Sequence, residues 1–336
     1  MIDSIQIHLT NKCNRKCYHC LFSSSRIHVK ELHISSWIDF FEKNSSFISS
    51  GCNINIFGGE PYLYKHIFDL INYLNRKKYN VGITTNASQI DIIKRSIEIG
   101  IKRLSVDVSS AEMMTHNELK PDTFINTVNL LKTLNIEDVK LYINIIIHAG
   151  NYNQIETTLD FISEFNIDNI SIYSLTEIGQ AKYSNFYMID EKIWSSIKAR
   201  VIKWIELNTP NFSIIWENSY LEKPEPVNFK LCSDKNTKTI DIRCDGNVYF
   251  CCLLMAQHLT ELNNDNCRML GNIKDDTIKD IINKRKKLII SQTALCPAIK
   301  ELSIANNKKK HFWCPYDWEY LSVKNSKSIG YMGNKQ

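Results

Sequence analysis

Short runs in which apolar and polar residues alternate are followed, along most of this chain, by longer stretches with apolar residues three or four positions apart. In the first run Ile5, Ile7 and Leu9 alternate with polar residues, and Trp37 and Phe41 follow at helical spacing. Alternation predicts strands, and the wider spacing predicts helices. The predicted strands occupy residues 4–9, 53–57, 80–84, 103–108, 140–147 and 169–175.

Six strand–helix units in succession predict parallel strands joined by right-handed crossovers. The chain is therefore predicted to be an α/β protein. A sheet of this kind can stay open or curl into a partial or full barrel, and the periodicity alone does not choose between these shapes. In each of them, functional residues are expected at the carboxyl ends of the strands.

Polar residues and glycines do gather at the carboxyl ends of the predicted strands or directly after them. One or two such segments would be ordinary turns. Six of them, with three cysteines after the first strand, indicate instead that this edge of the sheet is functional. The segments are residues 10–13, 58–61, 84–86, 105–107, 148–151 and 177–180.

The three cysteines after the first strand have a spacing typical of a metal site. Cys13, Cys17 and Cys20 form the pattern C-x3-C-x2-C. Three thiolates on one loop can bind three irons of a cuboidal 4Fe–4S cluster, which normally takes four cysteines. Such a cluster borrows a fourth ligand or leaves one iron open. Zinc is the rival metal, because His19 could complete a Cys3His site, and a structural zinc knuckle is the simplest alternative.

This loop resembles the signature of the radical S-adenosylmethionine (SAM) superfamily, C-x3-C-x-φ-C after the first strand of a partial (β/α)6 TIM barrel. His19 stands at the aromatic-type position. The sequence GGEP at 58–61 resembles the element whose backbone meets the amino group of SAM, and residues 85–86 resemble the polar pair after the third strand. SVD at 105–107 resembles the S-x-D element, and GQA at 179–181 resembles the G-x-A segment. The resemblance covers residues 1–200.

The resemblance implies a reaction and the residues that support it. The cysteines would hold a 4Fe–4S cluster whose open iron binds SAM, and the 5′-deoxyadenosyl radical formed from SAM would abstract hydrogen from a substrate. An electron donor such as flavodoxin or ferredoxin is the implied partner. Glycines let the main chain approach the ligand closely, and Glu60 would pair with the ammonium group of SAM. The implied SAM-binding residues are His19, Gly58, Gly59, Glu60, Thr85, Asn86, Ser105, Asp107, Asn144 and Gly179.

A second group of cysteines lies after residue 230, around a predicted hairpin at 239–250 that turns at an Asp-Gly pair. The pattern C-x13-G-x4-C, and GNI at 271–273 ahead of a predicted helix at 278–288, resemble the SPASM and twitch extensions of radical SAM enzymes. The later cysteine series of a full SPASM domain is missing. The resemblance therefore implies a small α+β twitch-like module with one auxiliary 4Fe–4S cluster. Its implied ligands are Cys232, Cys251, Cys296 and Cys314.

Three cysteines of this region remain without a role: Cys244, Cys252 and Cys267. Each can be a small buried side chain, a replacement ligand or a hydrogen-atom donor. The adjacent pair Cys251-Cys252 resembles peptide epimerases of the family, which invert α-carbons and use a cysteine thiol to return the hydrogen. Cys252 or Cys244 is therefore the expected donor. Because Cys13 comes so early, no folded leader-binding domain is expected before the barrel.

Length and composition restrict the number of domains, the role of the cysteines and the location of the protein. The 336 residues fit about two domains, and we expect a barrel at 1–200, a bridging segment at 201–228, the iron–sulfur module at 229–322 and a tail at 323–336. Eleven cysteines, an odd number, cannot all pair in disulfides. No secretory signal is present, so a cytoplasmic location is predicted. The sequence has no run of about 18 apolar residues for a membrane, and a net charge of +5 is too mild to indicate nucleic acid.

These features predict a radical SAM enzyme whose substrate is a ribosomally made peptide, with epimerisation or crosslinking as the reaction. The rival hypothesis is a radical SAM dehydrogenase or epimerase that acts on a sugar or another small molecule. A non-catalytic iron–sulfur or zinc protein is the third.

Overall fold

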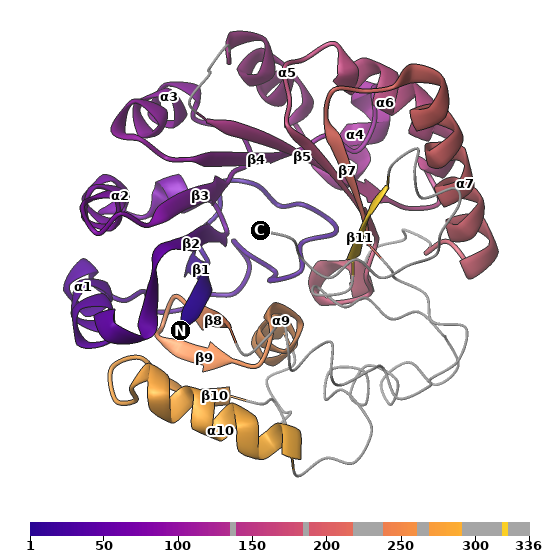
Figure 1. Cartoon of the computed structure of the whole chain (residues 1–336). Helices are drawn as coiled ribbons and strands as arrows, with labels where there is room; N and C mark the ends of the chain where they lie inside the picture. The colour runs from indigo at the N-terminus through magenta and orange to yellow at the C-terminus, as the bar shows by residue number, and fades with distance from the viewer. Residues whose placement is uncertain (135–138, 184–187, 218–237, 261–268, 291–317, 322–336) are drawn as a thin grey trace.

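One curved sheet organises the part of the chain that the computed structural model describes, which is residues 1–134, 139–183, 188–217, 238–260, 269–290 and 318–321. Within these ranges the sheet has eleven strands in the order β10-β9-β8-β1-β2-β3-β4-β5-β6-β7-β11 (Figure 1). The strands β1 to β7 are parallel neighbours in sequence order. Their bounds are Ile2–Thr10, Ile48–Gly58, Asn80–Thr84, Arg103–Asp107, Lys140–Ile147, Asn169–Ser174 and Ser213–Glu217.

Helices cover the outer face of this sheet, as Figure 1 shows. Their apolar sides pack on the strands, so that Trp37, Phe40 and Phe41 of α1 are buried. The helices α1 to α7 span Ile34–Lys43, Ile67–Arg76, Ile90–Ile99, Met113–Leu119, Phe124–Thr133, Ile155–Ser163 and Glu191–Asn208. Short 3-10 helices span Ser45–Phe47, Pro61–Leu63, Tyr152–Gln154 and Gly179–Tyr183. The α/β class and the partial barrel that the sequence predicts are therefore confirmed.

The two faces of each strand have different chemistry. On β1, Ile5 and Ile7 are fully buried against the helices, whereas Gln6 between them lines a cavity enclosed by the sheet. Arg103 and Ser105 of β4 line the same cavity, while Leu104 between them is buried outside. Because neighbouring strands are in register, the inward positions of the strands, which carry both polar and apolar side chains, line one lumen inside an apolar shell.

β7 was not among the predicted strands, and it lies within the segment predicted to bridge the two domains. It pairs in parallel with β6. Trp216 of β7 is fully buried and its ring lies 4.1 Å from that of Trp194 on α7. The predicted boundary at residue 200 falls inside α7, which ends at Asn208. Residues 201–217 therefore extend the barrel, and the rest of the domain division stays a prediction.

The C-terminal strands continue the barrel sheet at both of its edges. β8 (Thr239–Arg243) pairs in parallel with β1 and in antiparallel with β9 (Asn247–Tyr249), which confirms the predicted hairpin. β10 (Met269–Asn272) pairs with β9, and β11 (Trp318–Leu321) pairs with β7. A parallel sheet that ended at β1 would expose a row of unpaired backbone groups. β8 covers that edge.

Two helices of the C-terminal part, α9 (Cys252–Thr260) and α10 (Ile278–Ile290), pack beside the hairpin. Arg285 of α10 is buried and donates hydrogen bonds to the backbone oxygens of Thr239 and Tyr249. The Asn44 side chain, at the end of α1, accepts a hydrogen bond of 2.8 Å from the Ile278 N–H. These contacts join α10 to both the hairpin and the barrel. Within the described ranges, no helix combines the length and the apolar character needed to span a bilayer.

Candidate active site

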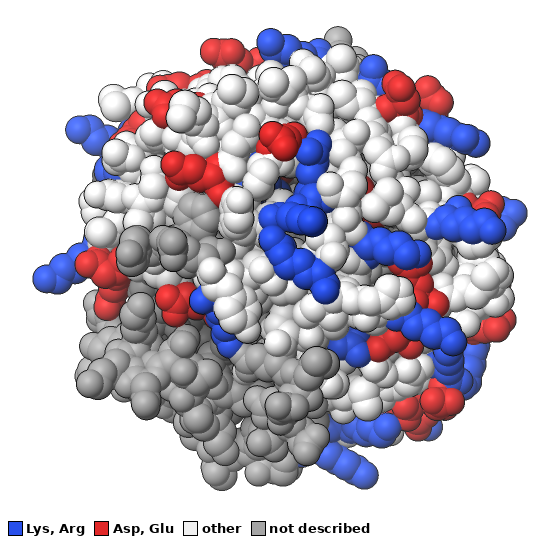
Figure 2. Space-filling model, turned by 180° about the vertical axis from the view of Figure 1, so that it is seen from behind, with Lys and Arg blue, Asp and Glu red and all other residues white. Residues whose placement is uncertain are grey.

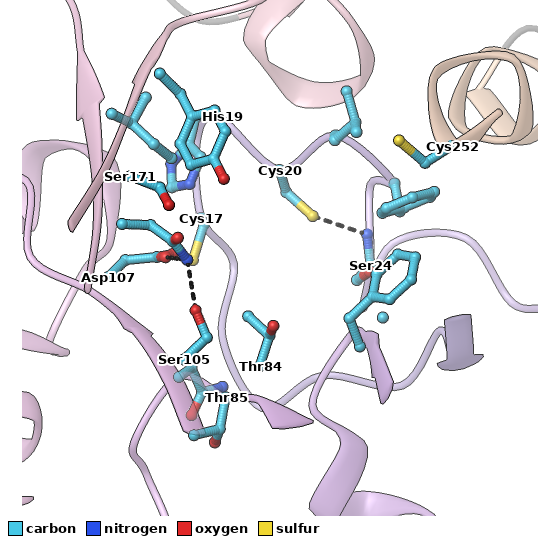
Figure 3. A pocket seen from close by; sticks show the side chains of 18 of the residues that line it. Cys17, His19, Cys20, Ser24, Thr84, Thr85, Ser105, Asp107, Ser171 and Cys252 are labelled. Carbon is cyan, nitrogen blue, oxygen red and sulfur yellow. Dashed lines mark hydrogen bonds between the residues drawn. The ribbon is translucent and has the colours of Figure 1, made fainter. Parts of the chain in front are cut away.

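A cavity of about 650 Å³ opens at the carboxyl ends of the strands and continues into the lumen. Cys13, Cys17 and Cys20 all lie in its wall, together with polar side chains from β3, β4, β5 and β6. Figure 3 shows Cys17 beside Asp107, Cys20 beside Ser24, and the side chain of Cys252 extending from α9. The sequence prediction that the functional groups meet at this edge of the sheet therefore agrees with the geometry.

Asn11, the second residue before Cys13, holds the two ends of the cysteine loop together. Its side-chain N–H donates to the Ile27 carbonyl at 2.6 Å, and its side-chain oxygen accepts from the Ser24 hydroxyl at 3.0 Å. Its backbone oxygen accepts from the Ser25 N–H at 3.0 Å. Asn11 is buried, so these bonds are shielded from water. The loop is thereby closed at its base and presents the cysteines at its tip.

Backbone and side-chain N–H groups point at the cysteine sulfurs. The Arg15 N–H donates to Cys13 Sγ at 3.4 Å, and the Ser24 N–H donates to Cys20 Sγ at 3.3 Å. The side chain of Asn86 donates to Cys13 Sγ at 3.7 Å. Such N–H···S bonds stabilise thiolates, which are the form that binds iron. They fit a cluster held at this loop.

Burial favours the protonated thiol of Cys13 and of Cys17 when no metal is bound. Burial raises the pKa of Cys17 to about 11, although Lys120 opposes the shift, and burial also raises the pKa of Cys13. Metal binding must displace these protons. Within the described ranges, no three His, Cys, Asp or Glu side chains converge on one metal-ion position. A cluster, in which each thiolate binds a different iron, therefore fits this loop better than a Cys3His zinc site with His19.

His19 lies in the cavity wall as an uncharged side chain. Burial, followed by the nearby charge of Lys120, lowers its pKa to about 3. Its Nδ1 lies 3.3 Å from the Leu119 backbone oxygen, which ties the cysteine loop to the end of α4. The Tyr18 N–H donates to the same oxygen at 2.9 Å. His19 thus stands where a neutral, flat side chain can contact a bound cofactor.

The glycine pair at the end of β2 packs directly on the backbone that leads into the cysteine loop. A Cβ on Gly58 would lie 2.4 Å from the Thr10 oxygen, and one on Gly59 would lie 2.0 Å from the Lys12 oxygen. The Gly59 N–H donates to the Thr10 oxygen at 2.7 Å. Both glycines line the cavity. The two glycines therefore allow the β2 end to pack closely on the protein's own backbone at Thr10 and Lys12, in addition to lining the cavity.

Neither Glu60 nor Gly179 is among the described residues that line the cavity. Both lie behind its wall. The buried Glu60 carboxylate accepts hydrogen bonds of 2.9 Å from the Thr85 hydroxyl and from the Asn86 N–H. Burial raises its pKa. It thus orders the Thr85-Asn86 segment, which does line the cavity, and the expected pairing of Glu60 with the SAM ammonium does not follow from this geometry. A Cβ on Gly179 would lie 2.4 Å from the Cys20 oxygen, so Gly179 supports the cysteine loop.

Ser105, Asp107 and Asn144 form one hydrogen-bonded group on β4 and β5, and Figure 3 labels the two β4 residues of this group. The Asn144 amide donates to Asp107 Oδ1 at 2.8 Å and to Ser105 Oγ at 3.0 Å. The ammonium of Lys120 forms an ion pair with the other Asp107 oxygen. All four line the cavity. Sequence reasoning missed Lys120, because it ends α4 and no spacing pattern connects it to the cysteines.

The C-terminal cysteines separate into distinct environments. Cys252 lines the cavity, whereas Cys244 is buried in the hairpin turn and Cys251 is buried beside it. Cys244 is not part of the cavity wall, so its expected role as a hydrogen donor loses support. Three of the four predicted ligands of the auxiliary cluster lie outside the described residues, namely Cys232, Cys296 and Cys314. The unassigned Cys267 also lies outside them.

The match with known proteins agrees with this site. Residues 7–162 match the Radical SAM superfamily, and residues 232–301 match SPASM, an iron–sulfur cluster-binding domain. The chain therefore contains a radical SAM domain followed by a SPASM domain. It consequently binds a 4Fe–4S cluster and SAM, and its SPASM domain binds iron–sulfur as well. Cys314 lies beyond the residues matched to SPASM.

Relatives of this radical SAM protein have diverse activities. The AdoMet-dependent heme synthase of Methanosarcina barkeri is 26% identical over 183 residues, 53% of this chain and 52% of that protein. The GTP 3′,8-cyclase of Staphylococcus epidermidis is 22% identical over 205 residues, 57% of this chain and 59% of that protein. The chain thus spans only about half the length of these curated relatives.

A solved structure is similar over more of the chain. Streptococcus suis SuiB bound to the precursor peptide SuiA has a TM-score of 0.70 at 18% identity, covering 94% of this chain and 76% of that one. Similarity at this level of identity shows a shared fold and leaves the reaction open.

Proposed function

We propose that this radical SAM enzyme inverts an α-carbon of a ribosomally made peptide, and that Cys252 returns the hydrogen atom. The supporting observation is the place of Cys252: in the described ranges it is the one cysteine other than Cys13, Cys17 and Cys20 that lines the cavity. Inversion needs hydrogen removal on one face of a carbon and hydrogen return on the other. The fold shared with SuiB, whose structure contains a precursor peptide, supports a peptide as the substrate.

Hydrogen-atom return requires a thiol rather than a thiolate. Burial raises the pKa of Cys252 well above its ordinary value of 9.0, and the carboxylate of Asp241 raises it further. The environment thus keeps the S–H group intact at neutral pH.

The atoms and electrons of the proposed reaction balance. A cluster held by Cys13, Cys17 and Cys20 would pass one electron from the donor to bound SAM, which would release methionine and supply the 5′-deoxyadenosyl radical. Removal of the α-hydrogen would yield 5′-deoxyadenosine and leave an unpaired electron on the substrate carbon. Cys252 transfers its hydrogen atom to the opposite face, so that a C–H bond forms and a sulfur radical remains. One electron from a donor of the flavodoxin or ferredoxin class and one proton from solvent restore the thiol.

The test uses the anaerobically reconstituted enzyme in deuterated water with a short precursor peptide encoded in a neighbouring reading frame. Each inversion should add one mass unit, because the exchanged thiol delivers deuterium. Cys252→Ala should still cleave SAM and exchange no hydrogen with solvent, while Cys52→Ala, which removes a buried cysteine outside the cavity, should match the wild type.

Other outcomes assign the reaction differently. A loss of two hydrogens from the peptide would replace epimerisation by crosslinking or dehydrogenation. If Cys244→Ala abolished deuterium incorporation and Cys252→Ala kept it, the hydrogen donor would be Cys244 in the hairpin turn. If the neighbouring genes encode sugar biosynthesis and no peptide reacts, the substrate is a small molecule instead. Absence of SAM cleavage, with about one zinc bound per chain, would exclude the enzyme class.

A further inference from the structure

The lumen beneath the cysteines contains a cation that the proposed chemistry does not use. Arg103 is the first residue of β4, and it lines the cavity on the same inward face as Ser105 and Asp107. Alternate residues of a strand rise by about 7 Å, so Arg103 lies deeper in the lumen than the Asp107–Lys120 ion pair. It is half-buried.

The neighbouring strands shape a slot for this guanidinium. On the β5 side, the Arg103 guanidinium lies 5.4 Å from the centre of the Tyr142 ring. On the β3 side, a Cβ on Gly82 would approach Arg103 Nε and Nη2 to 2.8 Å. The absence of a side chain at Gly82 therefore creates the room that the guanidinium occupies. A flat cation between an aromatic ring and a glycine keeps its N–H edge directed into the remaining space.

No acceptor of the protein meets that edge. Among the residues that the structure describes, none accepts a hydrogen bond from the Arg103 guanidinium and none forms an ion pair with it. Asp241, a carboxylate in the same cavity wall, belongs to β8, which β1, β2 and β3 separate from β4 in the sheet. A guanidinium carries five N–H donors in a planar fork that matches a carboxylate. A half-buried cation without an anion is unfavourable.

We propose that Arg103 binds a carboxylate of the substrate and thereby selects which residue of the peptide is modified. The inference rests on the proposed function, since a peptide carries carboxylates on Asp or Glu side chains and at its C-terminus. Arg103 is a specificity-determining residue in this role. The anionic group enters the lumen first, and the carbon to be modified stays near the rim with the cysteines.

Tyr173 of β6 lines the same cavity as Arg103 and Cys252. A carboxylate on Arg103 would therefore place the adjoining part of the peptide in the cavity that Cys252 also lines.

The experiment measures binding by calorimetry on the reconstituted protein with three N-acetylated alanine pentapeptides, of which the first two are also amidated at the C-terminus. One has a central Asp, the second has a central Asn, and the third has no charged side chain but a free C-terminal carboxylate. The wild type should bind a carboxylate peptide about tenfold more tightly than the Asn peptide, as expected for charge-assisted hydrogen bonds. Whichever carboxylate peptide binds more tightly than the Asn peptide identifies the source of the carboxylate, a side chain or the C-terminus.

Two variants should remove the preference by different routes. Arg103→Gln removes the charge, and Gly82→Ala keeps the charge while its methyl group displaces the guanidinium, whose flexible end can move without unfolding the sheet. Arg95→Gln is the matched control, because Arg95 also stacks on a ring, that of Phe68, but outside the cavity. It should keep the tenfold preference.

Two results would overturn the inference: equal behaviour of all three peptides on the wild type, including no binding, or a preference that survives in Arg103→Gln. These measurements need no turnover. A failure of deuterium incorporation would therefore refute the proposed epimerisation alone, and a failed carboxylate preference in an enzyme that incorporates deuterium would refute the role of Arg103 alone.

Discussion

Replacing Gly59 by alanine tests whether the contact between the GGEP segment and the cysteine loop positions SAM. The added Cβ would lie 2.0 Å from the Lys12 oxygen, whereas ordinary contact begins at 3.4 Å, so the two segments must separate by about 1.4 Å. Neither backbone can yield freely, because the Glu60 N–H donates to that same oxygen at 2.8 Å and the Gly59 N–H donates to Thr10.

The expected effect on catalysis exceeds the effect on stability. Overpacking of this kind costs about 1–3 kcal/mol of unfolding free energy. A displacement of about 1 Å between reacting groups lowers a rate on the order of 100-fold. Because all three cysteines follow Lys12 on one loop and move with it, iron binding should persist. The assay is release of 5′-deoxyadenosine from SAM under reducing conditions, beside iron content and urea unfolding.

Gly100→Ala is the matched control. Gly100 ends α3 with φ +106°, and its nearest contact for a Cβ is 3.5 Å, so an alanine there adds backbone strain of about 1–2 kcal/mol without a clash. It should lose comparable stability and retain SAM cleavage. Wild-type cleavage by Gly59→Ala, or an equal loss in Gly100→Ala, would refute the positioning argument.

Three further predictions concern charged and titrating groups. Because burial raises the pKa of Cys252, deuterium incorporation per SAM cleaved should stay constant from pH 7 to about 9; a decline across that range would show an ordinary, exposed thiol. Lys120→Met leaves the Asp107 carboxylate without its buried ion pair and should cost about 3–5 kcal/mol in urea unfolding, and Asp107→Asn in the same background should restore part of it. Burial lowers the pKa of His8 to about 3 from 6.5, so stability falls as pH falls below 6.5, by about 2 kcal/mol per such histidine between pH 7 and 5. In His8→Phe the loss between those two pH values should be smaller by that amount, and an unchanged loss would refute the assignment.

The local elements were predictable because each depends on a short stretch of chain. Alternation marks the strands, since successive side chains point to opposite faces. The Asp245-Gly246 pair marks the hairpin turn, where Gly246 has φ +90° and Asp245 accepts a hydrogen bond of 3.1 Å from the Asn247 N–H. β7 was not predicted because its five residues, Ser213–Glu217, lie in the segment assigned to the connection between the two domains. Its pairing with β6 and β11 identifies it as a strand.

The site was predictable where one loop carries the chemistry and unpredictable where several elements meet. Cys13, Cys17 and Cys20 must lie close together in any fold, because few residues separate them. Glu60 belongs to the motif, yet its carboxylate is directed at Thr85 and Asn86, and that orientation depends on which strand lies beside β2. No local pattern encodes such a neighbour.

By itself, the sequence determined the strand–helix alternation, the cysteine loop and the polar segments at the carboxyl ends of the strands, all of which are properties of residues close together in the chain. The tertiary structure alone decided that β8 pairs with β1, that Cys252 rather than Cys244 reaches the cavity, and that Lys120 meets Asp107. It also placed Arg103 between Gly82 and Tyr142. These contacts join residues of different strands and helices, and they form only when the whole sheet is packed. Periodicity along the chain does not report which elements become neighbours in the sheet.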